Sequence, residues 1–405
     1  MIKKESIDHL QVCLLSDEEQ GRRLARVYAG MRAAGMGAAL VRDNANLYYL
    51  TGRVFRGYVY LESDVEPEYF VRRPTTLRCR REGQLHFIRK PEEIADILAS
   101  TGRGVRADVA LELDALSYCE AVRLAKAFGA AAPGGDLSPV LRRARAVKTA
   151  QEQAMLRLSG ERQSLVYERI PHLYREGMTD IEFQIEIERA SRLGGCLGQF
   201  RVAGGEMELF MGNVLTGENG DTPSPYDFAM GGAGLDPSLP VGADGTVIKP
   251  GLPVMVDVNG NYTGYMTDMT RIYYTDSLAD EARRACALSA DICRELASML
   301  RPGTEAKALY ERAVAMAKEG GLGHCFMGHA SQAGFVGHGV GIEINELPVI
   351  APRSRDIIEA GNAVALEPKF VIPGIGAVGI ENTYIAGADG GECITKVAET
   401  PIELD

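Results

Sequence analysis

The chain has 405 residues, of which 46% are hydrophobic and 24% charged, the composition of a globular protein long enough for two domains. A formal net charge of −11 argues against nucleic acid or an anionic membrane as the main partner. The 8 cysteines include no CxxC pair, and no apolar run approaches the roughly 18 residues of a membrane-spanning helix. We therefore expect a cytoplasmic protein with reduced thiols, no membrane segment and no nucleic-acid partner.

Residues 1–138 alternate helical and strand-like segments, a pattern typical of a small α/β domain. Apolar residues recur at helical spacing in some segments, and short apolar runs elsewhere predict strands. In chain order we expect helices over residues 20–37 and 119–128 and strands over 38–41, 58–61 and 86–88. The stretch 130–139 is rich in Ala, Gly and Pro and is typical of a linker, which places the domain boundary between residues 138 and 139.

Residues 139–405 are predicted to form a second domain, which makes the whole chain an α+β protein of two domains. One long helical stretch begins near residue 141. Thr179 with Glu182 forms the capping box of a further helix. A second helix pair, over residues 280–299 and 304–319, repeats this plan.

Each helix pair is followed by a predicted hairpin that carries two acids. PGLPVMVD and AGNAVALE share a glycine, an apolar run and a final acid, and a turn and a second acid follow each of them. The acids are Asp257 with Asp268 and Glu367 with Glu381. If each hairpin turns midway between its acids, the two are cross-strand neighbours ~5 Å apart on one face. The helix–helix–hairpin repeat predicts pseudo-symmetric halves with a site on the seam between them.

Four carboxylates held together in apolar strands repel one another or become protonated unless a cation compensates them. His338, in the stretch GHGVG, supplies a nitrogen ligand, and its flanking glycines allow close approach of the backbone. This donor set suits two divalent ions ~3.5–4 Å apart, with Mn or Co favoured and Zn or Fe as alternatives. A lone acid or histidine is ordinarily structural. The prediction of a metal site therefore rests on the two pairs of acids in matching hairpins together with His338. His324 and His329 lack such an arrangement and are expected to be structural or exposed.

These residues resemble a known family. The segments VDVNGNYTGYMTDMTR, GHGVGIEINELP, ALEPKF and GIENTY are similar to the metal-binding segments of the pita-bread metallopeptidases. This M24 or creatinase-like family includes Xaa-Pro dipeptidase (prolidase), aminopeptidase P and methionine aminopeptidase. DNANLYYLTG resembles the creatinase-type N-terminal domain, which favours the prolidase and aminopeptidase P branch. By this resemblance, residues 1–138 are a creatinase/prolidase-type N-terminal domain and residues 139–405 are a pita-bread catalytic domain.

The resemblance implies five metal ligands, with Glu367 also acting as general base for a metal-bound hydroxide. The ligands are Asp257, Asp268, His338, Glu367 and Glu381. Family members are commonly homodimers in which the N-terminal domain of one chain approaches the active site of the other. Candidates for that contact are Arg53, Phe55 and Arg56, for which an exposed loop is the alternative interpretation.

Two positions depart from the prolidase pattern. Asn345 and Ser224 stand where prolidases usually carry histidines, one for substrate binding and oxyanion stabilisation and one for proton transfer. Both are candidate substrate-binding residues, because Asn345 can still donate a hydrogen bond although it cannot transfer a proton. Asp221, Tyr226 and Asp227 are candidates for the proton transfer.

The resemblance therefore implies a metal-dependent peptidase that cleaves Xaa-Pro dipeptides or the N-terminal residue of Xaa-Pro peptides. The alternative is a metal-dependent C–N hydrolase or lyase of a small zwitterionic metabolite on the same scaffold, because Asn345 and Ser224 change the pocket but not the metal ligands. A non-catalytic binding module is disfavoured because all five ligands are present.

Overall fold

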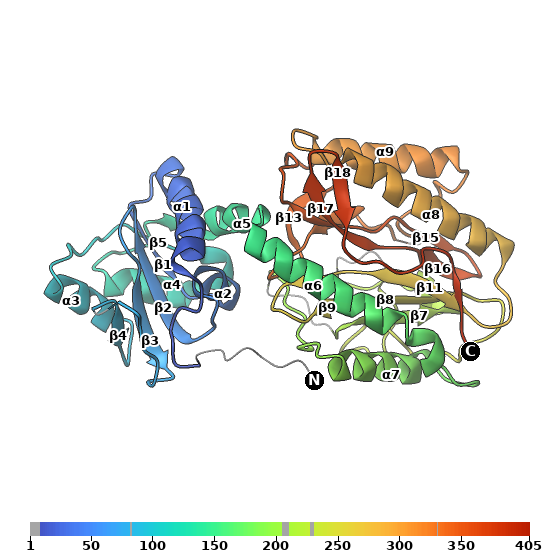
Figure 1. Ribbon diagram of the computed structural model, residues 1–405, viewed down its shortest axis with the longest axis horizontal. Coiled ribbons are helices and arrows are strands. Elements are labelled where there is room, and N and C mark those ends of the chain that lie inside the picture. The colour runs from blue at the N-terminus through green and yellow to red at the C-terminus, as the bar shows by residue number, and fades with distance from the viewer. Residues whose placement is uncertain (1–8, 82, 205–209, 227–230, 330) are drawn as a thin grey trace. The chain divides into compact units, whose positions relative to one another are not determined.

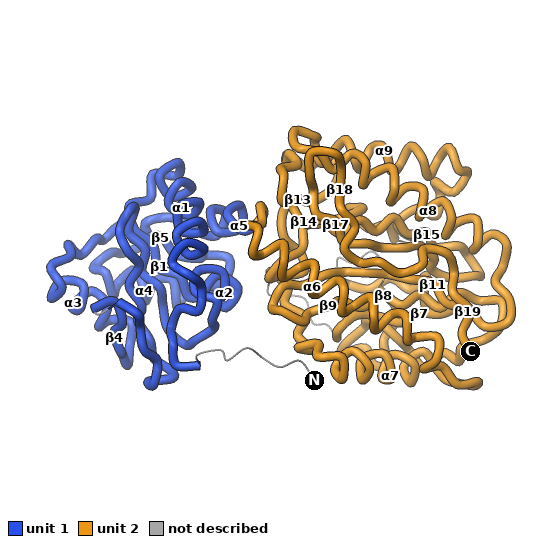
Figure 2. The backbone as a smooth tube through the Cα atoms, viewed as in Figure 1, with its two compact units in different colours: residues 1–145 blue, residues 146–405 orange. Residues whose placement is uncertain are grey.

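The computed structural model describes residues 9–81, 83–204, 210–226, 231–329 and 331–405. It contains two compact units, Met1–Arg145 and Ala146–Asp405 (Figure 2). The domain division expected between residues 138 and 139 stays a prediction. The expected linker over residues 130–139 is wrong, because it contains β6 (Gly135–Asp136), which pairs with β5 (Val109–Leu111). Glycine serves close packing there: a Cβ on Gly134 would come within 2.2 Å of the Asp108 carbonyl.

The first unit is built around a six-stranded sheet with the strand order β4-β3-β2-β1-β5-β6. The central strand β1 (Ala38–Val41) pairs antiparallel with β2 and parallel with β5. All four residues of β1 are buried, which explains why its sequence, AALV, is uninterruptedly apolar. The other strands are β2 (Arg56–Glu62), β3 (Glu68–Arg73) and β4 (Leu85–Phe87).

The helix α2 (Asn44–Thr51) of the first unit begins and ends at recognisable capping residues. DNANLYYLTG forms this helix, because Asp43 accepts hydrogen bonds from the amides of Ala45 and Asn46, and Gly52 adopts a left-handed conformation at the other end. The remaining helices are α1 (Asp17–Ala33), α3 (Glu93–Ser100), η1 (Leu113–Ala115), α4 (Tyr118–Ala127) and α5 (Ser138–Ala146).

The second unit consists of two similar halves (Figure 1). The first-half helices, α6 (Ala150–Tyr167) and α7 (Asp180–Leu193), lie along one side of the strands, and α8 (Asp280–Met299) and α9 (Ala306–Glu319) lie along the other. The capping box predicted at Thr179 and Glu182 is confirmed at the start of α7. The single long helix expected from residue 141 is wrong, because the chain leaves the helix after α5 and Thr149 starts α6 with its own capping box. None of the described helices combines the length and apolar composition needed to cross a bilayer.

The strands of the second unit form two main sheets and two hairpin extensions. The four-stranded sheet contains, in the order β19-β11-β8-β7, the strands β7 (Gly212–Thr216), β8 (Val254–Val258), β11 (Thr270–Tyr274) and β19 (Ile402–Glu403). The five-stranded sheet, in the order β13-β12-β14-β17-β18, contains β12 (Gly337–Gly339), β13 (Glu346–Ile350), β14 (Ala363–Leu366), β17 (Asn382–Gly387) and β18 (Gly390–Cys393). The extensions are β9 (Gly260–Asn261) with β10 (Met266–Thr267) and β15 (Lys369–Ile372) with β16 (Gly376–Gly379). Two short 3-10 helices, η2 (Ile170–Leu173) and η3 (Gly217–Asp221), complete the unit.

The register of the two acid-bearing hairpins was predicted correctly in one case only. β14 with β17 and β15 with β16 follow one register centred on Gly374, which places Glu367 opposite Glu381 as expected. In the other hairpin, Asp257 pairs with Thr270, so the expected register is wrong by two residues. Because side chains alternate with a period of two along a strand, a shift of two leaves Asp257 and Asp268 on the same face.

Candidate metal centre

The seam between the two halves of the second unit is a contact between the strand ends that carry the acids. Thr270 and Glu381 exchange two backbone hydrogen bonds, of 3.3 and 3.2 Å. The Thr270 hydroxyl also donates to Glu381 Oε2 over 2.9 Å. Since Thr270 pairs with Asp257 across the first hairpin, this contact brings the acids of both halves to one place.

A buried arginine, not expected from the sequence, holds the seam together. Arg271 donates from Nη1 to the carbonyl oxygens of Thr270 and Glu381, each over 2.8 Å. Its Nη2 donates to Asn382 Oδ1 over 2.7 Å. The side chain is 1% exposed, and a planar guanidinium can serve several acceptors at once. The sequence signal was an arginine inside the otherwise apolar strand TRIYY.

Asp268 is held in place from the other half of the unit by a threonine hydroxyl. Thr383 Oγ1 accepts a hydrogen bond from Asp268 N and donates one to Asp268 O, each over 2.8 Å. One hydroxyl does both because it has a donor and two acceptor lone pairs. The backbone of a first-half acid therefore depends on a second-half residue.

His338 lies on β12, between β13 and β14. Its Nδ1 is 3.2 Å from Gly339 O, and its Nε2 is 3.3 Å from Glu367 Oε1. A proton on Nδ1 that is donated to this carbonyl leaves the Nε2 lone pair facing the acids. The flanking glycines act as predicted, since a Cβ on Gly337 would come within 2.4 Å of the Ala365 carbonyl oxygen.

A lysine, also not expected from the sequence, lies among the acids. Lys369 Nζ is 2.8 Å from Asp257 Oδ2, 2.9 Å from Glu367 Oε2 and 3.3 Å from Glu381 Oε2. Its side chain is fully buried. Lys369 begins β15 two residues after Glu367, and the two side chains are in contact. That spacing in ALEPKF was the available sequence signal.

The acids differ in how well their charges are compensated. Burial raises the pKa of Glu367, but Lys369 and His338 together outweigh burial and hold the pKa at about 2. Burial, together with the charge of Asp257, raises the pKa of Asp268 to about 7. Burial and the charge of Asp268 raise the pKa of Glu381 well above its usual range. The positive charge of Lys369 thus compensates the carboxylate of Glu367, whereas the carboxylates of Asp268 and Glu381 need a further cation to stay ionised.

The donor set beside Asp268, His338 and Glu381 fits a divalent ion. One ligand atom from each of these residues lies within 4.8 Å of the others. Glu381 Oε1 is buried and meets no hydrogen-bond partner among the described residues. A bound cation would give this oxygen a partner and compensate two acids at once. Carboxylate and imidazole donors suit ions such as Mn, Co, Fe or Zn.

The two candidate substrate-binding residues have different surroundings. Asn345 accepts a hydrogen bond from Ala203 N over 2.7 Å and donates one to Ala203 O over 3.0 Å. Both ends of its amide therefore hold the chain near Ala203. Ser224 Oγ accepts a hydrogen bond from Tyr226 N over 3.3 Å. A role in substrate binding stays a prediction for both residues.

The candidates for proton transfer are only partly described. Asp221 Oδ2 is 3.1 Å from Nδ1 of His329, so this histidine is paired with an acid from another segment. The Tyr226 side chain is partly exposed, and Asp227 lies outside the described residues.

The three residues proposed for a dimer contact follow α2 in the first unit. Phe55 is 4% exposed, so the exposed-loop interpretation is wrong for this residue. Phe55 and Arg56 line a pocket of about 590 Å³ together with three further arginines, Arg42, Arg72 and Arg73. Arg53 is half-buried. A contact with a partner chain stays a prediction.

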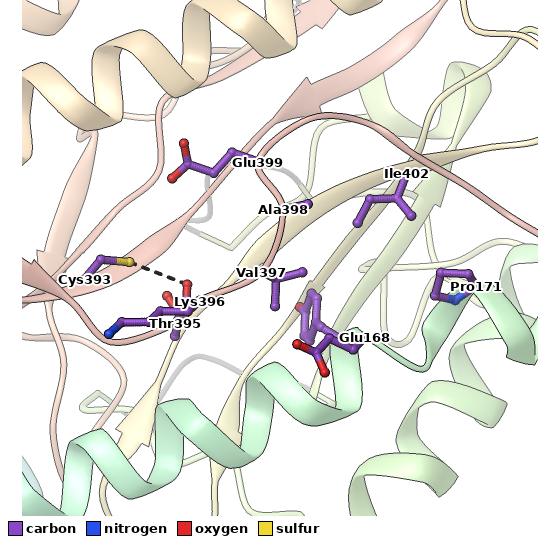
Figure 3. Close-up of a pocket in the computed structure, with 10 residues that line it drawn as sticks. Glu168, Pro171, Cys393, Thr395, Lys396, Val397, Ala398, Glu399 and Ile402 are labelled. Atoms are coloured by element: carbon purple, nitrogen blue, oxygen red, sulfur yellow. Dashed lines mark hydrogen bonds between the residues drawn. The ribbon is translucent and has the colours of Figure 1, made fainter.

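Another pocket of the second unit, of about 530 Å³, is drawn in Figure 3. It is lined by Tyr167 at the end of α6, by Glu168 and Pro171 just after it, and by residues between Cys393 and Ile402. Cys393 donates there to Thr395 O over 3.5 Å, and burial raises the pKa of its thiol. None of the five expected metal ligands is among the described residues that line this pocket, so the pocket is separate from the candidate metal centre.

Acids and an imidazole gathered on the seam of two helix–helix–hairpin halves define a metallohydrolase of the pita-bread type. The chain belongs to metallopeptidase family M24, whose model matches residues 154–388. Residues 23–147 match the creatinase/prolidase N-terminal domain. The expected fold of a creatinase-type unit followed by a pita-bread unit is therefore confirmed.

Named relatives match over different shares of their length. The Xaa-Pro dipeptidase of Pyrococcus furiosus is 30% identical over 44% of this chain and 49% of its own length, so the chain spans about half of that relative. The putative dipeptidase YkvY of Bacillus subtilis is 25% identical over 94% of this chain and 99% of its own. The solved Xaa-Pro dipeptidase from Bacillus anthracis, 22% identical, covers 95% of this chain and 100% of its own with a TM-score of 0.77.

Proposed function

We propose that this M24 metallopeptidase cleaves Xaa-Pro dipeptides or removes the N-terminal residue of Xaa-Pro peptides. The observation that carries the proposal is the largely buried cluster of Asp268, His338 and Glu381, whose ligand atoms lie within 4.8 Å of one another. The similarity to an Xaa-Pro dipeptidase over part of the chain and to a putative dipeptidase over 94% of it supports the choice of substrate.

The residues of the centre have separable roles in this proposal. Asp268, His338 and Glu381 hold a divalent ion, with Mn or Co favoured. When bound, the ion supplies Lewis-acid polarisation of the scissile carbonyl and lowers the pKa of water. Glu367 is the general base, because Lys369 keeps its carboxylate ionised and Oε1 faces His338.

The proposed partners follow from the same evidence. A small peptide is the substrate, and the protein acts as a cytoplasmic homodimer. The 8 cysteines are too widely scattered for a disulfide framework, which supports a reducing compartment, and the resemblance to dimeric family members supports the dimer. Sedimentation equilibrium of the full chain tests the dimer, and a monomer at micromolar concentration would refute it.

The activity is tested with the full chain on a panel of Xaa-Pro dipeptides in Mn²⁺ or Co²⁺. Matched dipeptides with Ala in place of Pro serve as substrate controls, and EDTA-treated protein serves as the metal control. We expect metal-dependent release of proline and a roughly 10²–10⁴-fold loss of kcat in Glu367→Gln. The absence of any metal-dependent proline release across the panel contradicts the proposal.

The alternative function, a C–N hydrolase or lyase, was based on Asn345 and Ser224, which stand where prolidases usually carry histidines. Both ends of the Asn345 amide are used by Ala203, so this residue gives no specific support for a new substrate. We therefore favour the peptidase.

A further inference from the structure

Lys369 reaches the acids from a position that the chain itself determines. Lys369 is the first residue of β15, and its ammonium projects into the same cluster as Glu367, 2.9 Å from Glu367 Oε2. Its ammonium contacts Asp257 from the first half and Glu367 and Glu381 from the second half. A single built-in cation therefore bridges the seam between the two halves of the unit.

These contacts use the whole hydrogen-bonding capacity of the ammonium. A protonated lysine has three N–H donors and no acceptor. Lys369 has three carboxylate partners, and its side chain is 0% exposed. Neither a free N–H group for substrate nor a lone pair for nucleophilic or base chemistry remains. Lys369 is therefore a fixed positive charge within the centre.

A divalent ion on the Asp257 side of the centre would compete with this charge. Ions of this class bind carboxylate oxygens at about 2.0–2.2 Å. An ion bound to Asp257 and Glu381 together would lie beside the Lys369 ammonium, which donates to an oxygen of each. Two cations so close, in a buried setting with little solvent screening, repel each other strongly.

On the side of the centre that faces Asp268 and His338, the ligand atoms suit one cation. In the described part of the chain, the ion pairs of Lys369 are with Asp257, Glu367 and Glu381 and not with Asp268. The ligand atoms of Asp268 and His338 lie within 4.8 Å of a Glu381 oxygen. Glu381 Oε1 is the buried carboxylate oxygen that has no hydrogen-bond partner among the described residues.

We propose that this centre binds a single divalent ion, held by Asp268, His338 and Glu381, and that the Lys369 ammonium replaces the second ion expected from the sequence. The proposal rests on the metal centre of the proposed function and specifies its stoichiometry. Asp257 is then the counter-charge of Lys369 rather than a metal ligand. Glu367 lies between the two cations, with one oxygen on Lys369 and the other facing His338.

The test is the number of Mn²⁺ ions bound to the full chain. The apoprotein is titrated with Mn²⁺ by calorimetry, dialysed and analysed for metal, and its electron paramagnetic resonance spectrum is recorded. We expect one tight equivalent per chain and the spectrum of an isolated Mn²⁺ ion. Two tight equivalents, or the spectrum of an exchange-coupled pair, overturn the proposal. So does a protein that binds no Mn²⁺.

Variants of the lysine give a second, independent reading. Lys369→Met removes the charge and frees the three carboxylates, so we expect it to take up a second equivalent of Mn²⁺ and to show the coupled spectrum. Lys396→Met, which removes an exposed lysine of the same unit, is the matched control and should stay at one equivalent. If a folded Lys369→Met variant still binds one ion, the proposal is wrong. If this variant does not fold, the stoichiometry of the wild-type protein decides.

Failure of this proposal and failure of the proposed function give different results. A chain with two tight ions that hydrolyses Xaa-Pro dipeptides refutes the role of Lys369 and keeps the activity. A chain with one tight ion and no activity on the dipeptide panel keeps the role of Lys369 and refutes the substrate assignment.

Discussion

The ion pair between Lys148 and Glu346 offers a quantitative test of the energetics of the second unit. The two side chains are 1% and 2% exposed, and Lys148 Nζ lies 2.9 Å from Glu346 Oε2. Glu346 Oε1 also accepts hydrogen bonds from Ile342 N over 3.1 Å and from Glu343 N over 3.2 Å. One buried carboxylate therefore organises the turn that links the strand of His338 to β13. Lys148→Met removes the ammonium and keeps most of the apolar stem.

The expected loss of stability follows from the charge that remains. Removing one partner of a buried ion pair costs about 3–5 kcal/mol, because the other charge stays buried without compensation. The two amide donors to Glu346 remain in Lys148→Met, so we expect the lower end, about 3 kcal/mol. At roughly 2–4 °C per kcal/mol for a domain of this size, the Tm of the second unit falls by roughly 6–12 °C. Adding Glu346→Gln should recover part of the loss, because a neutral amide needs no counter-ion.

Calorimetric melting of the full chain measures both effects, and an exposed ion pair provides the control. Arg157 and Glu392 lie 2.7 Å apart, but their side chains are 43% and 49% exposed. Arg157→Met should therefore change the free energy of unfolding by no more than about 1 kcal/mol. If Lys148→Met lowers the Tm no further than Arg157→Met does, burial does not set the strength of this pair. If the double variant is no more stable than Lys148→Met, an uncompensated Glu346 is not the cause.

Three further predictions concern separate parts of the chain. Thr383→Val removes both hydrogen bonds to the Asp268 backbone, so it should weaken Mn²⁺ binding roughly 10–100-fold in calorimetric titration; an unchanged affinity contradicts the positioning role. Burial raises the pKa of Glu112 from 4.5 to about 7, so its stabilising effect is complete below about pH 4.5 and is lost as the pH rises through about 7. Hydrogen exchange of the β1 amides should report this loss of roughly 3 kcal/mol in the wild type and not in Glu112→Gln. Gly339→Ala places a Cβ 2.2 Å from the Leu347 carbonyl oxygen, so metal analysis should find little bound Mn²⁺ while the β1 amides exchange as in the wild type.

The repeat and one hairpin register were predictable because local sequence determines them. The turn PGIG leaves one plausible centre at Gly374, and the strands on either side follow in register. NGNYTG contains two glycines, and the structure turns near Gly264, whose φ is +88°. The register is centred between Thr263 and Gly264, one residue beyond the midpoint of Asp257 and Asp268, and this accounts for the two-residue error in the Asp257 hairpin.

Lys369 and Arg271 were not expected because their partners are distant in sequence. A lone lysine or arginine is ordinarily exposed, so composition gives no reason to place either one in the core. Arg271 bonds the Glu381 carbonyl across 110 residues, and Lys369 meets Asp257 across 112. Only the strand registers and the contact between the two halves bring these groups together. Asn345 was predicted to be a functional residue from its place in the motif, but its hydrogen-bond partner, Ala203, was not predictable because it is distant in sequence.

The division of the seam between two halves also affects how the protein is made. The aspartates of the first half leave the ribosome well before Glu381, which follows Arg271 by 110 residues. At about 5–20 residues per second, synthesis of that interval takes roughly 5–20 s. For most of this time Lys369 is absent from the nascent chain, and for all of it Glu381 and Thr383 are absent, although Asp257 and Asp268 have already been made. A product that stops before Glu381 lacks one of the three proposed metal ligands. Binding of the metal ion by this set of ligands is therefore possible only after Glu381 has been synthesised.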